Sequence, residues 1–206
     1  MESSKDNIRQ KIIEVSRESF AYYGYYGTST GSIIKNAGVS KGALYWHFKN
    51  KLELFRTVLD EEMNLVRKIM IPTCKDLEEK DLRTFFLERG EEIFEYYLAH
   101  GQSALLLLQM NLEAQRKSGE IASLASEFTD TLIEDLVNRV IELRPGYLEF
   151  QGELELRELV ALFEAAFCGL LFGLNIRRSS SLTKKLWRFM ICQLFPEEGK
   201  EVYFQE

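Results

Sequence analysis

Apolar residues recur at intervals of three and four along nearly the whole chain, and this spacing constrains the fold more than any other feature. Residues three and four apart lie on one face of an α-helix, so the pattern indicates amphipathic helices. Strand-like alternation is scarce, and only three prolines, Pro72, Pro145 and Pro196, interrupt the pattern. We therefore expect an all-α fold of about nine helices.

The N-terminal part is expected to hold three helices in close succession. The inward stripe of the first is predicted to consist of Ile8, Ile12, Ile13, Val15, Ser19, Phe20 and Tyr23. Gly24 can end that helix, and Thr30 can cap a short second one. Gly38 then permits a tight turn, and Ser40 can cap a third helix at about 40–47. Two short helices so close together predict a helix-turn-helix.

Charge is distributed unevenly along the chain. Residues 1–51 contain eight basic and four acidic residues, a net charge of +4, while the whole chain carries −6, so the remainder carries −10. A basic segment on an acidic body is typical of a small DNA-reading domain, although chance clustering on a solvated surface would give the same count. We expect a DNA-binding domain at 1–51 and a separate domain at 52–206.

The second domain is expected to be helical throughout. A helix should run from about Lys51 until Pro72, and the apolar spacing predicts further helices at about 81–100, 103–117, 120–144, 153–178 and 181–195. The stretch Leu159–Ile176 is long enough to cross a membrane, but Glu164 interrupts it. We interpret it as a buried interface helix and expect no membrane contact.

The third helix offers two different faces. Leu44 and Phe48 lie four apart and are expected to point inward with Val39. The opposite face then presents Lys41, Gly42, Tyr45, Trp46 and His47. A cation, a residue without a side chain and aromatic rings with polar tips suit close approach to a phosphate backbone and to base edges. The alternatives are that the aromatic residues belong to the core and that His47 binds a metal.

At these residues the sequence resembles the DNA-binding domain of the tetracycline-repressor (TetR) family. The resemblance covers Ile12–Phe55, roughly a quarter of the chain. The matching elements keep their order and spacing: Phe20, Gly24, Thr28-Ser29-Thr30, Ala37-Gly38-Val39-Ser40-Lys41-Gly42, Leu44-Tyr45, His47-Phe48, Lys51 and Leu54.

The resemblance implies a set of DNA contacts. Residues near phosphates would be Thr28, Ser29, Thr30 and Ser40. Groove or backbone contacts would come from Lys41, Gly42 and Tyr45, a sugar–phosphate contact from Trp46, and further phosphate contacts from His47 and Lys51.

The resemblance also implies a transcriptional regulator, most simply a repressor, that binds a palindromic operator as a homodimer and is released by a small-molecule inducer. We expect dimerisation through helices 153–178 and 181–195. A ligand pocket is predicted among Phe94, Tyr97, Met110, Phe128, Phe167 and Asn175, although core packing is the alternative for each of them.

Other classes of function find little support in the sequence. No catalytic motif is evident, and the three cysteines and two histidines do not fall at metal-ligand spacing, so we expect no enzyme activity, metal or cofactor. The first nine residues lack the apolar core of a secretion signal, so a cytoplasmic protein is expected. A helical adaptor that binds proteins and not DNA is the alternative function.

Overall fold

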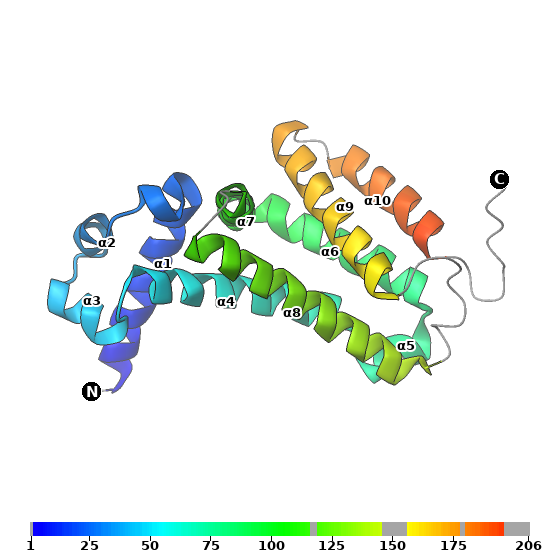
Figure 1. Cartoon of the computed structure of the whole chain (residues 1–206), viewed down its shortest axis with the longest axis horizontal. Helices are drawn as coiled ribbons and strands as arrows, with labels where there is room; N and C mark the ends of the chain where they lie inside the picture. Colours follow the sequence, from blue (N-terminus) through cyan, green and yellow to red (C-terminus); the bar gives the residue numbers. More distant parts are fainter. Residues whose placement is uncertain (1, 116–118, 146–155, 178–179, 196–206) are drawn as a thin grey trace. The chain divides into compact units, whose positions relative to one another are not determined.

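The computed structural model describes residues 2–115, 119–145, 156–177 and 180–195, and every element in these ranges is helical (Figure 1). The predicted all-α fold is therefore confirmed. The helices are α1 Glu2–Gly27, α2 Thr30–Ala37, α3 Lys41–His47, α4 Lys51–Met70, α5 Cys74–Glu79, α6 Leu82–Ala99, α7 Gly101–Ala114, α8 Glu120–Leu143, α9 Leu156–Arg177 and α10 Ser180–Leu194.

Most predicted helices are found, with small shifts at their ends. Gly24, which was expected to end α1, interrupts it with a positive φ of 68°, and the helix continues to Gly27. The predicted break at Gly101 falls one residue earlier, at His100, so Gly101 opens α7. The short helix α5 was not predicted, although a capping box, Thr73 with Asp76 three residues later, marks its start in the sequence. In the described part of the chain, no helix is long and apolar enough to cross a membrane.

The helices fall into two compact units that interleave along the chain. Unit 1 comprises the residues up to Leu65 together with His100–Phe128, and unit 2 comprises Val66–Ala99 and the residues from Thr129 onward. Unit 1 therefore joins α1, α2, α3 and the first part of α4 to α7. The expected functional division after residue 51 remains a prediction.

Unit 1 is built around α1, which packs along α7 and also contacts α2 and α3. Its core is formed by fully buried apolar side chains, among them Ile12, Ile13, Phe20, Ile33, Leu44 and Phe55. The prediction of the inward stripe was wrong for Tyr23, which is 70% exposed. The helix turns Ser16 and Ala21 inward as well, and the Ser16 hydroxyl donates to the carbonyl oxygen of Ile12 at 2.6 Å.

Unit 2 has an aromatic core centred on Trp187 of α10. The indole ring lies against Gly90 of α6, and its Nε1 donates to the carbonyl oxygens of Phe86 and Leu87, each at 3.2 Å. The ring centroids of Phe94 and Phe163 lie 5.4 and 4.9 Å from that of Trp187. These contacts hold α6, α9 and α10 together.

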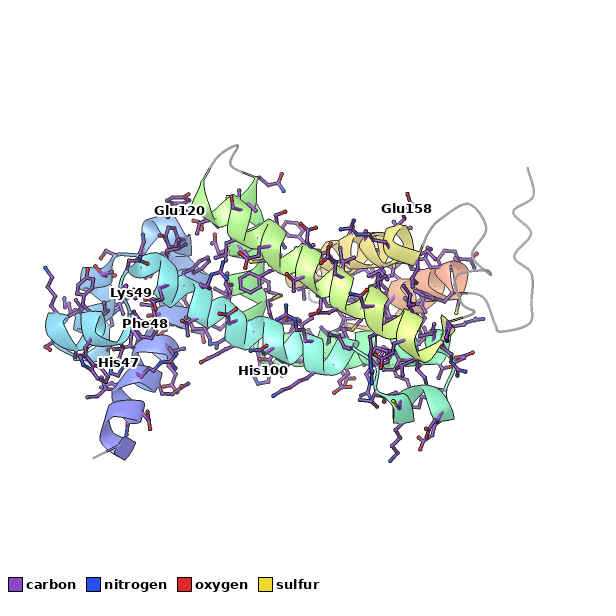
Figure 2. The ribbon with its side chains drawn as sticks, turned by 60° about the horizontal axis from the view of Figure 1, so that its bottom comes forward. His47, Phe48, Lys49, His100, Glu120 and Glu158 are labelled. Atoms are coloured by element: carbon purple, nitrogen blue, oxygen red, sulfur yellow. The ribbon has the colours of Figure 1, made fainter. Side chains whose placement is uncertain are left out.

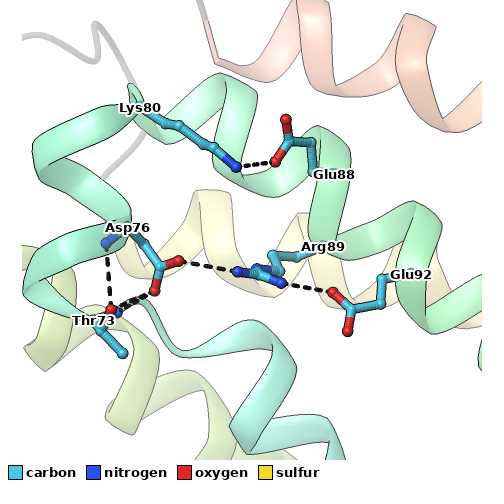
Figure 3. A network of polar contacts seen from close by, with 6 residues as sticks. All are labelled: Thr73, Asp76, Lys80, Glu88, Arg89 and Glu92. Atoms are coloured by element: carbon cyan, nitrogen blue, oxygen red, sulfur yellow. Dashed lines mark hydrogen bonds and ion pairs between the residues drawn. The ribbon is translucent and has the colours of Figure 1, made fainter.

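A polar network joins α5 to α6 at the surface of unit 2 (Figure 3). One carboxylate oxygen of Asp76 accepts hydrogen bonds from the backbone N–H and the hydroxyl of Thr73, at 2.9 and 2.6 Å. The other accepts one from Arg89 at 3.0 Å, and Arg89 also pairs with Glu92. Lys80 pairs with Glu88 beside them. The Thr73 bonds, helped by Arg89, lower the pKa of Asp76 to about 2.

Asp76→Asn should test this network. At neutral pH we expect it to lower the stability of unit 2 by about 1 kcal/mol, a shift in Tm of about 2–4 °C, because the capping box and the Arg89 pair lose the negative charge. Since the pKa of Asp76 is lower in the folded protein than in the unfolded chain, its stabilisation is present above about pH 4 and is lost as the pH falls towards 2.

Thermal unfolding followed by circular dichroism at a series of pH values gives the comparison. The difference in Tm between wild type and Asp76→Asn should disappear at the acidic end. Glu78→Gln, at an exposed position of the same helix, should behave like the wild type at each pH. A constant difference between wild type and Asp76→Asn at every pH would contradict the role given to this carboxylate.

Candidate nucleic-acid interface

The helices α2 and α3 form a tight pair because each end is capped locally. Ser29 caps the start of α2 by accepting from the backbone N–H of Ser32 at 3.0 Å. Gly38 ends that helix in the left-handed conformation, with φ 62° and ψ 35°. Ser40 then caps α3 by accepting from the N–H of Ala43 at 3.0 Å. The cap predicted at Ser40 is confirmed, whereas the cap of α2 is Ser29 and not Thr30.

Two side chains hold α3 in place from behind, as predicted. Leu44 is fully buried and Phe48 is 2% exposed, and the backbone N–H of Phe48 donates to the carbonyl oxygen of Leu44 at 2.9 Å. The guanidinium of Arg9, from α1, lies 5.4 Å from the centre of the Phe48 ring. Figure 2 labels His47, Phe48 and Lys49 where α3 ends. The orientation of α3 is therefore fixed by apolar packing against the rest of unit 1.

The outward face of α3 carries the residues predicted to meet DNA. Lys41 and Gly42 are exposed, Tyr45 is 43% exposed and Trp46 is 66% exposed. His47 is half-buried, and its ring centroid lies 4.5 Å from that of Trp46. Tyr45 and Trp46 therefore do not belong to the core of the described chain.

Gly42 is not required by the packing of the protein itself. A Cβ at this position would have the Ser40 hydroxyl oxygen, 3.8 Å away, as its nearest neighbour. Alanine would fit there and would favour the helix by about 1 kcal/mol. The glycine therefore weakens α3 without an internal benefit and leaves space next to the helix for something outside the chain.

Three of the hydroxyl-bearing residues predicted near phosphates lie together with α3. Ser29 and Ser40 cap the two helices with their side chains exposed. The hydroxyl of Thr30, at the start of α2, lies 3.5 Å from the hydroxyl of Tyr45. Since the N-terminal turns of α2 and α3 have free backbone N–H groups, this region favours anions.

Thr28 and Lys51, two other residues predicted near phosphates, have partners inside the protein. Thr28 is 2% exposed, and its hydroxyl lies within hydrogen-bond distance of the carbonyl oxygens of Gly24 and Ser19, at 2.7 and 3.0 Å. The ammonium of Lys51 donates to the carbonyl oxygens of Tyr25 and Thr28 at 2.8 and 2.9 Å. Burial lowers the pKa of Lys51, while the negative charge of Glu113 opposes that shift. The DNA contacts predicted for these two residues stay a prediction.

Sequence reasoning missed several cations and one acid. Lys11, Lys35 and Lys49 are exposed in the same unit, and the position of Lys49 directly after Phe48 was the available signal. Glu113 of α7 is buried in unit 1, where its carboxylate accepts hydrogen bonds from two backbone N–H groups at the end of α1. No local pattern marks that role, because its partners are nearly ninety residues away.

Unit 2 contains a cavity of about 40 Å³ among α4, α6, α8 and α9. Its lining is apolar apart from one acid: Val66, Met70, Ile93, Leu132, Ile133, Leu136, Val160, Phe163, Glu164 and Phe167. The Glu164 carboxylate also accepts a hydrogen bond from the thiol of Cys168 at 3.1 Å.

Only Phe167 of the predicted pocket residues lines this cavity. Phe94 and Tyr97 are buried in unit 2 away from its lining, and Met110 and Phe128 are buried in unit 1. The side chain of Asn175 lies outside the described residues. Aromatic residues that looked suitable for a pocket pack in the core; Phe94, for example, stacks on Phe167 with ring centroids 4.8 Å apart. The predicted pocket stays a prediction.

Comparison with known families identifies the N-terminal part. The family described as bacterial regulatory proteins, tetR family, matches residues 12–58. The HTH-type transcriptional regulator AcrR of Shigella flexneri is 48% identical over 50 residues, which cover 24% of this chain and 23% of AcrR. QacR of Staphylococcus aureus, an HTH-type transcriptional regulator, is 46% identical over 56 residues, covering 27% of this chain and 30% of QacR.

A further relative is named a probable acrEF/envCD operon repressor, from Escherichia coli, with 39% identity over 57 residues that cover 28% of this chain and 26% of the relative. This chain thus matches only about a quarter to a third of the length of these curated relatives.

Solved structures share the fold of nearly the whole chain. A structure of a TetR-family transcriptional regulator from Syntrophomonas wolfei matches with a TM-score of 0.74 and 19% identity, covering 92% of this chain and 95% of that one. FadR of Bacillus subtilis, solved in complex with stearoyl-CoA, matches with a TM-score of 0.70 and 19% identity, covering 90% and 96%. Residues 12–58 therefore match the tetR family of bacterial regulatory proteins directly, and nearly the whole chain shares the fold of these solved structures.

Proposed function

We propose that this protein is a sequence-specific DNA-binding regulator of transcription, a repressor that reads a palindromic operator with α3. The observation that carries the proposal is the outward face of α3, where Lys41, Gly42 and Tyr45 are exposed on a helix that Leu44 and Phe48 hold from behind. The names of the relatives that match this segment, regulators and one operon repressor, support it.

The chemistry of this face suits a major groove. An α-helix fits the width of the groove, and a lysine and a tyrosine hydroxyl can bond to base edges or phosphates there. Glycine at position 42 lets the backbone come close to the DNA. The exposed caps at Ser29 and Ser40 bring helix N-termini to the phosphates on either side.

Gly42→Ala separates DNA binding from stability. The substitution should raise the Tm slightly, because alanine favours the helix and meets no close neighbour. It should nevertheless lower affinity for a DNA duplex selected from a random library by about tenfold, because the methyl group occupies space that the DNA needs. Fluorescence anisotropy at several salt concentrations measures the affinity.

Lys41→Ala should also weaken binding and should reduce the slope of log affinity against log salt by about one, since one phosphate or base contact by a cation is lost. Gly101→Ala is the matched control, since a Cβ there has no neighbour within 4 Å and α7 carries no part of the face. Wild-type affinity in both Gly42→Ala and Lys41→Ala would refute the face assigned to α3.

A second copy of the chain is the partner proposed for α9 and α10. On α9 the exposed Leu162, Ala165, Gly169 and Phe172 follow one another at helical spacing. On α10 the exposed apolar residues are Leu182, Leu186 and Phe189, with exposed fractions of 38, 43 and 67%. The two helices pack against each other, so these stripes can form one apolar surface that a symmetry mate would cover as a four-helix interface.

Phe189→Glu combined with Leu186→Glu should therefore produce a monomer. A charge on each side of a two-fold interface would be buried without a partner, and this costs several kcal/mol per dimer. Light scattering at micromolar concentration should give about twice the chain mass for the wild type and for Lys75→Glu, an exposed position of α5. A dimeric double variant would rule out this interface.

The cavity of unit 2 is the proposed site for an apolar effector. At about 40 Å³ it is much smaller than the roughly 300 Å³ that a drug-sized ligand needs, so binding would have to favour a more open packing of α8 and α9. Trp187 is placed to report such a change. Phe163 and Phe167 line the cavity, and their ring centroids lie 4.9 and 6.0 Å from that of Trp187.

A Trp46→Phe background leaves Trp187 as the single tryptophan for a fluorescence and thermal-shift screen of small apolar molecules. A true effector should shift Trp187 emission in this background and weaken binding of the wild-type protein to the selected duplex, since Trp46 itself belongs to the outward face of α3. Val160→Leu, which fills part of the cavity, should reduce the response, and Val140→Leu, at a buried position outside the lining, should not. Hits that bind equally well to the filled variant would disprove the site.

A further inference from the structure

A buried carboxylate on α7 holds the chain where α1 ends. Glu113 is 6% exposed, and its Oε2 accepts from the backbone N–H of Tyr25 at 2.9 Å. Its Oε1 accepts from the N–H of Tyr26 at 3.2 Å. A carboxylate with one oxygen on each of two successive N–H groups fixes the direction of that peptide segment.

The backbone before these two residues is shaped to receive the carboxylate. Gly24 has a φ of 68°, a conformation that residues with a side chain rarely adopt. A Cβ at Gly24 would also lie 2.5 Å from Oε1 of Glu113, closer than two such atoms can approach. The positive φ therefore favours glycine here, and a Cβ would also displace the Glu113 carboxylate from its present position.

Lys51 of α4 binds the same segment through its carbonyl groups. Its ammonium donates to the carbonyl oxygens of Tyr25 and Thr28, and it lies 4.2 Å from the centre of the Tyr25 ring. The N–H of Tyr25 thus points to an acid of α7 and its carbonyl oxygen to a cation of α4. We call Glu113, Lys51 and the residues 24–28 between them the α1-end clamp.

The α1-end clamp leads directly into the DNA-reading helices. Thr28, whose carbonyl Lys51 holds, is followed by Ser29, the N-cap of α2, and α3 begins after the turn at Gly38. Thr28 also bonds back to the carbonyl oxygen of Gly24 at 2.7 Å, so the segment has little freedom of its own. The start of α2 is therefore set by what holds residues 24–28.

We propose that Glu113 is a positioning residue for DNA recognition: through the α1-end clamp, α7 sets where α2 and α3 lie, so that a displacement of α7 is passed to the reading helix. For its DNA readout this inference rests on the proposed function. Along the chain α7 follows α6 after the single residue His100. The hydrogen bonds are directional, and this makes the clamp sensitive to small shifts of α7.

Glu113→Gln tests the clamp with almost no change in shape. An amide offers one acceptor oxygen, and its NH₂ group cannot accept from the second backbone N–H, so one side of the clamp must open. We expect amide hydrogen exchange in peptides covering residues 24–47 to become about tenfold faster. Discrimination between the selected duplex and a random duplex should fall about tenfold, while affinity for the random duplex and its salt dependence stay unchanged, because the exposed cations remain.

Val140→Ala, a core truncation in unit 2, controls for lost stability alone. It should leave both the exchange of residues 24–47 and the discrimination at wild-type values. Wild-type exchange and discrimination in a folded Glu113→Gln protein would overturn the proposal.

If Glu113→Gln fails to fold, Lys51→Met opens the clamp from the side of α4, and hydrogen exchange is measured in that variant. Unchanged exchange in residues 24–47 would then overturn the proposal. Failure of the proposed function can be told apart from failure of this inference. A wild-type protein that does not discriminate between the two duplexes would contradict sequence-specific DNA binding, whereas hydrogen exchange still decides whether Glu113 holds α2 and α3.

Discussion

A helix of seven residues is unstable by itself in water, and the candidate site depends on how this protein holds one in place. Two apolar side chains, Leu44 and Phe48, pack α3 against the rest of unit 1, and the hydroxyl of Ser40 caps the start of the helix. Because these three residues hold and cap the helix, the side chains on its outer face are not needed to keep α3 in place. Lys41, Tyr45 and the space beside Gly42 can therefore serve recognition, even at the expense of helix propensity.

The sequence alone predicts those parts of the fold and site that local chemistry decides. The all-α fold, the break in α1 at Gly24, the cap at Ser40 and the inward pair on α3 all follow from spacing and turn residues within a few positions. Side chains whose partners are distant in sequence were not predictable in this way. For Lys51, the sequence does not show that the carbonyl groups of Tyr25 and Thr28 lie beside its ammonium.

Tyr23 shows the same limit on a shorter scale. The spacing from Ser19 predicts an inward position, but the buried stripe of α1 runs through Ser16, Phe20 and Gly24, and Tyr23 lies beside it and is exposed. The lining of the cavity in unit 2 could not be predicted for a related reason. Large aromatic residues such as Phe94 suggest a binding pocket in sequence, yet Phe94 packs in the core, and most of the cavity lining comes from aliphatic side chains such as Val66 and Val160.

The surroundings of the cavity and the α1-end clamp differ in the kind of contact that holds them, and this difference suits the two tasks proposed for them. The cavity of unit 2 lies beside aromatic and aliphatic packing around Trp187, which can rearrange around an apolar ligand with a modest loss. The α1-end clamp depends on charged side chains bonded to backbone groups, through Glu113 and Lys51. Such bonds fail over a fraction of an ångström, because their strength depends steeply on distance and angle. Soft packing can accept a ligand, and directional bonds can convert a small displacement of α7 into a changed position of α3.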